Sequence, residues 1–338
     1  MGGKKGNVSA GKIVFTCGIT SGQNLFFYVK DKKMKYIKGT TDFNIEEESV
    51  VTLGKFDGIH KGHNILLEKV KELAGEKYKT VIFTFAVHPN VYLRSDKPKV
   101  LMTNLERYEF LSRDSYDYLM ECPFVEEIAS MEPEDFVEEI LIKQLKAAHI
   151  VVGADFHFGH GRRGNTDLLK RYERSGCFKV HIVEKEKYEG KDISSTFVRS
   201  EVEMGRMEEV TELLGHPYTI VGEVEYGRQL GRTLGIPTTN IMPPDNKLLP
   251  PYGVYFTRTI IEGKSYKGIT NIGCKPTIAD ELRRGVETYL FDFSGNLYGK
   301  TLTVELYKYE RPEMKFKSVE ALKEKMESDI EKAKNYEY

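Results

Sequence analysis

Apolar runs of strand length alternate with helical patterns as far as about residue 215, and beyond that point strands follow one another directly. In the first part, "SVVTL" and "KTVIFTF" precede helical patterns such as "NILLEKVKELA" and "NLERYEFLSR". Such alternation is typical of a largely parallel sheet whose strands are connected by helices. It predicts an α/β domain for the first part of the chain.

The second part has a different pattern. Runs such as "GVYFTRTII" and "VETYLFDF" are separated by Gly, Asn and Pro turns, which predicts an antiparallel β-barrel. A final helix is expected after Ser318, which can cap it. Apolar residues then recur on one face, at Val319, Leu322, Met326 and Ile330.

We expect four segments along the chain. Residues 1–33, which begin with the polar, Gly-rich "MGGKKGNVSAGK", are expected to be a loosely attached extension; alternatively the native start is Met34, after which the first plausible strand begins. The α/β domain is expected over residues 34–200, a helical linker over 201–214, and the barrel domain over 215–338.

Composition excludes several classes of protein. The 338 residues are enough for two domains, and 50 Lys+Arg against 51 Asp+Glu leave no basic surface for nucleic acid. No apolar run reaches transmembrane length, and no signal peptide is evident. Four scattered cysteines, Cys17, Cys122, Cys177 and Cys274, predict free thiols in a reducing compartment. We therefore expect a cytoplasmic protein with no membrane partner; the oligomeric state is left open.

The first candidate site is "GKFDGIHKGH", where a strand is expected to end and a helix to begin. His60 and His63 then share one face of the helix start, and Gly62 lets a ligand approach the backbone. Unpaired N–H groups and the helix dipole favour phosphate there. Two imidazoles at such a place can stabilise the charge that builds during nucleotidyl transfer. The alternative is a pair of loop histidines without a role.

A second stretch, "ISSTFVR", follows the expected strand "KVHIVEK". Ser194, Ser195 and Thr196 can cap a helix and donate to phosphate, and Arg199 lies one turn further on. Taken alone, this is an N-cap followed by a surface arginine. Its position directly after a strand favours a phosphate cradle shared with the histidines.

Three other patterns are set aside. "GHGRRG" matches G-x-G-x-x-G, but "GADFHF" separates it from the preceding strand, so the tight turn of a dinucleotide site is missing. "GNLYGKT" is one residue short of a Walker loop and is interpreted as a hairpin turn. His157 and His160 lack the further ligands that a structural zinc site needs.

The barrel part carries "GRQLGRTLGIPTTN". Gly227, Gly231 and Gly235 allow the backbone to fold around a phosphate chain. Thr238 and Asn240 offer hard oxygen ligands, which suit Mg²⁺ bridging phosphates. An ordinary loop between barrel strands is the alternative.

The strand "VETYLFDF" is expected to place Glu287 on one face with Tyr289, Phe291 and Phe293. A carboxylate on an apolar face is costly unless it is paired or functional. Burial there would raise its pKa and suit it to act as a general base for a hydroxyl nucleophile. An edge position with Glu287 in solvent is the competing interpretation.

In this order, "GKFDGIHKGH", "TFAVHP", "VVGADFHFG", "ISSTFVR", "GRTLGIPTTN", "VETYLFDF" and "YERPEMKF" resemble the bacterial bifunctional riboflavin kinase/FAD synthetase family from about Met34 to the C-terminus. The resemblance implies a Rossmann-like nucleotidyltransferase domain with a parallel sheet, followed by a six-stranded kinase barrel. It implies riboflavin, FMN and ATP as substrates, FAD as product and Mg²⁺ as cofactor.

Carried over by position, the resemblance gives each site a residue set. At the adenylyl site it implies His60 and His63 as catalytic residues, with Asp155 and Phe158 in a flavin-binding loop. Its remaining nucleotide residues would be Gly54, Phe56, Asp57, Gly62, Ser194, Ser195, Thr196 and Arg199. Departures from the family pattern occur at Lys55, Ala86-Val87 and His157.

In the kinase barrel the resemblance implies Glu287 as the base and Thr238 and Asn240 at Mg²⁺ and phosphate, near Gly227, Gly231 and Gly235. Arg311 and Glu313 would lie at the flavin side, and Thr239 replaces a usual Ala. The prediction is therefore an enzyme that makes FMN and then FAD. The alternatives are a riboflavin kinase with an inactive first domain, another H-x-G-H nucleotidyltransferase with an unrelated barrel, or a flavin-binding regulator.

Overall fold

The computed structural model describes residues 34–86, 99–226, 236–276 and 282–338. Residues 33–338 form one compact unit. The predicted extension over 1–33 and the predicted phosphate-loop glycines Gly227, Gly231 and Gly235 lie outside the described residues.

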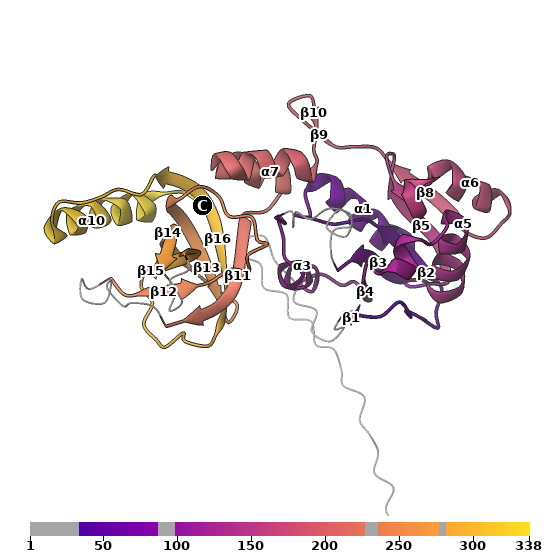
Figure 1. Cartoon of the computed structure of the whole chain (residues 1–338), viewed down its shortest axis with the longest axis horizontal. Coiled ribbons are helices and arrows are strands. Elements are labelled where there is room, and N and C mark those ends of the chain that lie inside the picture. Colours follow the sequence, from indigo (N-terminus) through magenta and orange to yellow (C-terminus); the bar gives the residue numbers. More distant parts are fainter. Residues whose placement is uncertain (1–33, 87–98, 227–235, 277–281) are drawn as a thin grey trace, which may run out of the picture. The chain divides into compact units, whose positions relative to one another are not determined.

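The first part contains a six-stranded sheet in the order β1-β4-β3-β2-β5-β8, with every neighbouring pair parallel. The predicted Rossmann-like parallel sheet is thus confirmed (Figure 1). Its strands are β1 Lys35–Lys38, β2 Ser49–Leu53, β3 Lys79–Phe85, β4 Tyr118–Cys122, β5 Ala147–Gly153 and β8 Lys179–Val183.

The helices of this part follow the strands as expected. The stretch "PEDFVEEILIKQLK" is a single short turn followed by nine residues of π-helix, rather than one α-helix. The helices are α1 Lys61–Ala74, α3 Asn104–Leu111, α4 Glu126–Ala129, α5 Pro133–Asp135, the π-helix Phe136–Gln144 and α6 Thr166–Arg174. Short elements complete it: β6 His157–Phe158, a 3₁₀ turn His160–Arg162, β7 Gly164–Asn165, β9 Lys187–Tyr188 and β10 Lys191–Asp192.

The central strands β2, β3 and β4 are buried on both faces, which explains why they are nearly continuous apolar runs. Val51 and Phe83 belong to one apolar cluster, whereas Val50 and Ile82 belong to another, because successive strand residues point to opposite faces. The second cluster also contains Leu67 of α1, which packs against β2, β3 and β5.

Strand β2 lies between β3 and β5. The sheet continues through β3 and β4 on one side of β2 and through β5 and β8 on the other, so the strand order reverses between β2 and β5. In open parallel sheets, ligands bind outside the carboxyl ends of the strands at such a reversal of strand order. The loop after β2 carries "GKFDGIHKGH", and the loop after β5 carries "GADFHFG". The fold therefore places the first candidate site where this class of sheet binds ligands.

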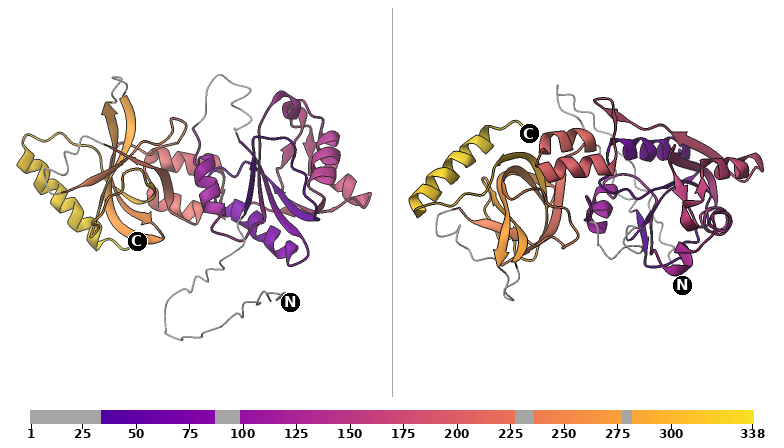
Figure 2. Two further views of the ribbon diagram at one scale, coloured as in Figure 1. Left: turned by 90° about the horizontal axis from the view of Figure 1, so that it is seen from below. Right: turned by 45° about the horizontal axis from the view of Figure 1, so that its top comes forward.

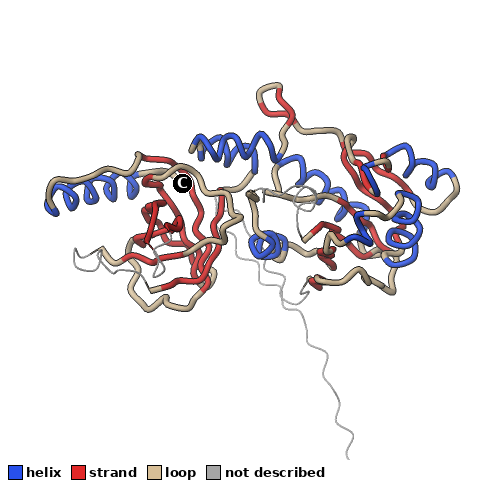
Figure 3. Tube along the Cα trace, in the orientation of Figure 1, coloured by secondary structure: helices blue, strands red, loops and turns tan. Residues whose placement is uncertain are grey.

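The second part is a closed antiparallel barrel in the order β11-β12-β15-β14-β13-β16, as predicted. Figure 3 shows the contrast between the mixed first part and the strand-rich second part. The strands are β11 Tyr218–Glu225, β12 Thr238–Ile241, β13 Gly253–Ile261, β14 Lys264–Pro276, β15 Leu282–Leu290 and β16 Thr301–Arg311.

Two local predictions in the barrel need correction. The stretch "GNLYGKT" is not a hairpin turn, because it connects β15 and β16, which are not neighbours in the barrel. The residues "TTNI" are a barrel strand, β12, paired with β11 and β15, rather than part of a loop. Their side chains are therefore held in strand register.

Three helices accompany the barrel. α7 Ser195–Met204 and α8 Met207–Leu214 form the connection, and α8 packs against β11 and β16. The final helix, α10 Val319–Asn335, is capped by Ser318 as predicted and packs against β14 outside the barrel (Figures 1 and 2). Its apolar face is less regular than expected, because Val319 is exposed while Asp329 and Ala333 are buried.

Candidate active sites

The two histidines of "HKGH" stack on each other at the start of α1. Their ring centroids are 3.8 Å apart, and His60 is the N-cap residue. The Nδ1 atom of His60 accepts a hydrogen bond from the backbone N–H of His63, at 3.3 Å. The proton of a neutral His60 therefore sits on Nε2, which leaves that nitrogen as a donor.

Burial keeps both imidazoles neutral. It lowers the pKa of His60 to about 4 and the pKa of His63 well below its usual value, and the neighbouring His60 lowers the latter further. Among the described residues, the buried Nδ1 of His63 has no hydrogen-bond partner. A buried polar atom without a partner is costly, so a ligand group that satisfied it would gain energy.

Packing explains the glycines and the aromatic residue of this loop. A Cβ on Gly62 would lie 3.2 Å from Nδ1 of His60, a tight contact that would press against the stacked ring, so packing favours glycine there besides any ligand contact. Phe56, predicted as a nucleotide residue, is fully buried with a positive φ of 47°, and its ring lies 5.1 Å from that of His63. A Cβ on Gly54 would lie 3.1 Å from the Phe56 ring. The buried Phe56 ring therefore packs against the ring of His63.

The structure brings "ISSTFVR" to the histidine loop through Asp57. An Arg199 guanidinium nitrogen lies 2.8 Å from Oδ2 of Asp57, and the Ser195 hydroxyl donates to the Asp57 carbonyl at 2.8 Å. Burial raises the pKa of Asp57, while the N–H of Met102 and the Arg199 charge oppose that rise. We call Gly54–His63 together with Ser194–Arg199 the HKGH site.

The other residues of the second stretch have different roles. Ser194 is the N-cap of α7 and accepts from the N–H of Phe197 at 3.2 Å, as a capping residue should. Thr196 lies exposed in the first turn of the helix. A capped helix start with an exposed hydroxyl and a nearby arginine suits a triphosphate.

The two residues predicted to bind flavin in the loop after β5 lie in different environments. Asp155 is exposed and forms an ion pair with Lys185 at 3.0 Å. Phe158 is buried in the apolar cluster on one face of the sheet, 5.6 Å from the ring of Phe136. "GHGRRG" forms a short turn between β6 and β7, not the start of a long helix, in agreement with its exclusion as a dinucleotide site.

A buried ion pair behind the HKGH site was missed by sequence reasoning. Arg107 of α3 pairs with Glu121 of β4 at 2.7 Å, and Arg107 also donates to the carbonyls of Lys55 and Phe85. Asn104 donates to the Ala86 carbonyl at 2.9 Å. These contacts fix the chain where it leaves β2 and β3. A glutamate within the apolar strand "YLMEC" was the available signal.

The barrel carries a separate polar group, which we call the barrel site: Thr238, Asn240, Asn271, Glu287 and Glu313. Glu287 of β15 pairs in register with Asn240 on one side and Asn271 on the other. The Thr238 hydroxyl donates to Oε1 of Glu287 at 2.7 Å, and Asn271 donates to Oε1 of Glu313 at 3.1 Å. Paired residues share a face of the sheet, so Thr238, Asn240, Asn271 and Glu287 lie on one side of the barrel wall, and Glu313, beyond the end of β16, joins them through Asn271.

The surroundings of Glu287 differ from the expectation. Val286 and Leu290 point into the barrel core, and Glu287 points to the opposite, outer face, where it is half-buried. Tyr289 and Phe291 lie in the cluster under α10, as expected, but β15 ends at Leu290 and Phe293, predicted on the same face, packs against the other barrel cluster instead. Yet the immediate neighbours of Glu287 are polar, so it is not an isolated carboxylate among apolar side chains.

Arg311, predicted on the flavin side, lies at the end of β16. Its Nε donates to Oδ2 of the buried Asp329 of α10 at 2.7 Å, and Lys325 pairs with the same carboxylate at 2.8 Å. Arg311 therefore anchors the final helix to the barrel.

The described residues also bear on the predictions about metal sites, cysteines and membrane spans. Within them, no group of three or more His, Cys, Asp or Glu side chains could hold a metal ion. Cys122, Cys177 and Cys274 are free thiols, as expected, whereas Cys17 lies outside the described residues. No helix in these ranges is both long and apolar enough to span a bilayer.

Both the sheet part and the barrel part match families of known proteins. The family model for FAD synthetase matches residues 42–197, and the family model for riboflavin kinase matches residues 214–337. The bifunctional riboflavin kinase/FMN adenylyltransferase of Listeria monocytogenes is 35% identical over 293 residues, covering 86% of this chain and 93% of the relative. The proteins of the same name from Bacillus subtilis and Escherichia coli are 36% and 34% identical, covering 86% and 88% of this chain and 93% and 96% of theirs.

A solved structure shares the whole fold. A Streptococcus pneumoniae chain described as a macrolide-efflux protein matches with a TM-score of 0.79 and 31% identity, covering 90% of this chain and 99% of that one. Its description differs from those of the curated relatives, although its fold covers both the sheet and the barrel of this chain.

Proposed function

Since this chain belongs to the family of bifunctional riboflavin kinase/FMN adenylyltransferases, we propose that its barrel site phosphorylates riboflavin and its HKGH site adenylylates the FMN that results. We assign the first reaction to residues 215–338 and the second to residues 34–200, joined by the helical segment 201–214. The family models, which end at residue 197 and resume at residue 214, support this division.

The observation that carries the adenylyl assignment is the meeting of Asp57, Ser195 and Arg199 beside the stacked histidines. Asp57 comes from the loop after β2, whereas Ser195 and Arg199 come from the first turns of α7, and they meet beyond the carboxyl end of β2. There they combine a helix start, a guanidinium and two neutral imidazoles, all of which favour a phosphate chain.

At the HKGH site, a phosphate oxygen of FMN attacks the α-phosphorus of ATP, the bond from that phosphorus to the β-phosphate oxygen breaks, and pyrophosphate leaves. Arg199, oriented by Asp57, and the hydroxyl of Thr196 bind the triphosphate. His60 and His63 are neutral, so they stabilise the oxygens on which charge builds by donating N–H groups rather than through a full positive charge.

In the barrel site, the 5′-hydroxyl of riboflavin attacks the γ-phosphorus of ATP, Glu287 accepts the hydroxyl proton, and ADP leaves. Thr238 and Asn240 are the side chains that would hold Mg²⁺. Their hard oxygen atoms fit an ion that takes one or two protein ligands and completes its shell with phosphate and water. When bound, Mg²⁺ neutralises phosphate charge.

The test is a single incubation of the full chain with riboflavin, ATP and Mg²⁺, followed by separation of the flavins. We expect FMN first and FAD after it. FMN alone would identify a riboflavin kinase with an inactive first domain, and neither product would leave flavin binding as the function.

A further inference from the structure

Lys247, in the connection between β12 and β13, is only 2% exposed. Its ammonium group donates to the Leu101 carbonyl at 2.7 Å, to Oε2 of Glu106 at 2.8 Å and to the Thr219 carbonyl at 2.7 Å. An ammonium has three N–H donors, so all of them are used. This lysine belongs to the barrel part of the chain, whereas Leu101 and Glu106 belong to the sheet part.

The Glu106 carboxylate is equally well satisfied. It accepts from the N–H of Thr103 at 2.7 Å, as part of the capping box of α3, and from the N–H of Val221 of β11 at 3.0 Å. Replacing a buried ion pair by apolar residues is often neutral or stabilising, so stability alone is a weak explanation for this one. What the pair does provide is a fixed position for the backbone around Leu101.

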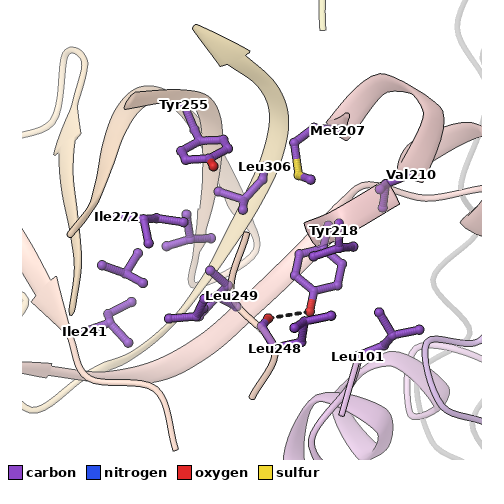
Figure 4. Close-up of a cluster of buried hydrophobic side chains, with 14 of the residues drawn as sticks. Leu101, Met207, Val210, Tyr218, Ile241, Leu248, Leu249, Tyr255, Ile272 and Leu306 are labelled. Carbon is purple, nitrogen blue, oxygen red and sulfur yellow. Dashed lines mark hydrogen bonds between the residues drawn. The ribbon is translucent and has the colours of Figure 1, made fainter. Parts of the chain in front are cut away.

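The backbone on both sides of this contact is also tied to the barrel part. Val100 forms a parallel bridge with Lys247, and its N–H donates to the Asn246 carbonyl at 2.7 Å. The N–H of Leu248 donates back to the Val100 carbonyl at 2.8 Å. The Leu101 side chain belongs to the apolar cluster that also contains Tyr218 and Leu248 (Figure 4).

One peptide group then connects Lys247 to the HKGH site. The Leu101 carbonyl accepts from Lys247, and the N–H of Met102, which belongs to the same peptide group, donates to Oδ1 of Asp57 at 3.0 Å. The peptide is planar, so fixing its oxygen also fixes the direction of its N–H. Asp57 in turn holds Arg199 through its other carboxylate oxygen.

We propose that Lys247 of the kinase part is a positioning residue for adenylyl transfer, because it orients the Leu101–Met102 peptide that fixes Asp57 and hence Arg199. The barrel part thus completes the nucleotide site of the other part. This inference rests on the proposed assignment of adenylyl transfer to the HKGH site.

The test compares Lys247→Met with the wild-type chain, using FMN and ATP for adenylyl transfer and riboflavin and ATP for phosphorylation. We expect the KM for ATP in FAD formation to rise about tenfold or more, since small misplacements of binding groups cost large factors in rate. The kinetic constants of riboflavin phosphorylation should stay within about twofold. In hydrogen exchange, the Met102 amide should lose protection in the variant.

Two controls separate positioning from stability. The Glu106→Gln/Lys247→Met double variant has no unpaired buried charge, although its single amide oxygen can accept from only one of the N–H groups of Thr103 and Val221. It should melt at a higher temperature than Lys247→Met alone while keeping the raised KM for ATP. If Lys247→Met alone does not fold, the KM for ATP of the double variant tests the positioning role instead. Phe256→Leu, in the barrel cluster beneath α10, should lower the melting temperature without changing this KM.

An unchanged KM for ATP in the double variant, or an equal rise in Phe256→Leu, would overturn the positioning role. A wild-type chain that makes no FAD would instead overturn the proposed function. The two failures are therefore distinguishable.

Discussion

The hydroxyl of Thr238 donates to a carboxylate oxygen of Glu287 across two neighbouring strands of the barrel, at 2.7 Å. The proposed general base and a proposed Mg²⁺ ligand are thus in direct contact. Both are held by strand register rather than by a loop. In the proposed mechanism this contact marks the point of the barrel wall where the hydroxyl nucleophile and the phosphate chain meet.

Glu287→Gln should reduce riboflavin phosphorylation by on the order of 10²–10⁴-fold, because the amide keeps the size of the side chain but cannot accept the proton. Supplied with FMN, the variant should still make FAD. Rates of FMN and FAD formation, measured separately, check this. Glu305→Gln on β16 of the same barrel is the matched control and should leave both rates unchanged; a comparable fall in that control would refute the assignment.

Thr238→Ala and Asn240→Ala should each shift the Mg²⁺ titration of phosphorylation to higher concentration, because each removes an oxygen ligand or its support. Thr239→Ala serves as the control, since this neighbour is on the same strand and its hydroxyl lies near the Thr288 carbonyl instead. Superimposable titration curves for all four proteins would exclude Thr238 and Asn240 as metal ligands.

His63→Ala should lower FAD formation by on the order of 10²–10³-fold, the cost of losing a donor to developing charge. Riboflavin and ATP should then yield FMN that accumulates. His181→Ala, at a half-buried histidine pair on β5 and β8, should have no effect on either reaction. If His63→Ala instead lowered both activities together with the melting temperature, a purely structural role for this residue would be established.

The stability of the protein should fall as the pH drops from about 6.5 toward 4. The pKa of His60 is lowered from 6.5 to about 4 by burial, so the unfolded chain binds a proton at this residue over that interval while the folded chain does not. The contribution of His60 to the free energy of unfolding is fully present above pH 6.5 and is lost progressively as the pH falls to about 4. Unfolding in urea across this range, compared with His60→Gln, checks it, and the variant should show the shallower dependence.

Parallel curves for the wild-type chain and His60→Gln would contradict the buried, neutral state of His60. For the same reason, FAD formation should not change between pH 8 and pH 6 through protonation of His60, whose pKa of about 4 lies below that range.

Sequence patterns predicted the architecture well, because apolar periodicity reports directly on burial. The stretches "SVVTL" and "NILLEKVKELA", predicted as a strand and a helix, form β2 and most of α1. The later strand-like runs form the closed barrel. The strand β12 was missed because four polar or β-branched residues after a Gly-rich stretch carry no apolar alternation. "GNLYGKT" was misjudged because sequence does not tell which strands of a barrel are neighbours.

At the candidate sites, residue types were predictable but their partners were not. The meeting of Asp57 with Arg199 depends on tertiary contact across 142 positions, which no local pattern encodes. Phe56 matched the family motif, yet neither its burial against the His63 ring nor its positive φ could be predicted from that motif. The flavin-side position of Arg311 stays a prediction, whereas its ion pair with the buried Asp329 could not be predicted, because a charged motif does not reveal its partner on a later helix.

The Glu106–Lys247 contact also has a consequence for the newly made chain. The two residues are 141 positions apart, so at about 5–20 residues per second a ribosome adds the lysine roughly 7–30 s after the glutamate. During that interval the Glu106 carboxylate has no ammonium partner and must stay in water, which keeps the start of α3 undocked. The contact between the sheet part and the barrel part therefore forms only after part of the barrel has been synthesised, and a chain truncated before residue 247 would leave the Glu106 carboxylate without this partner.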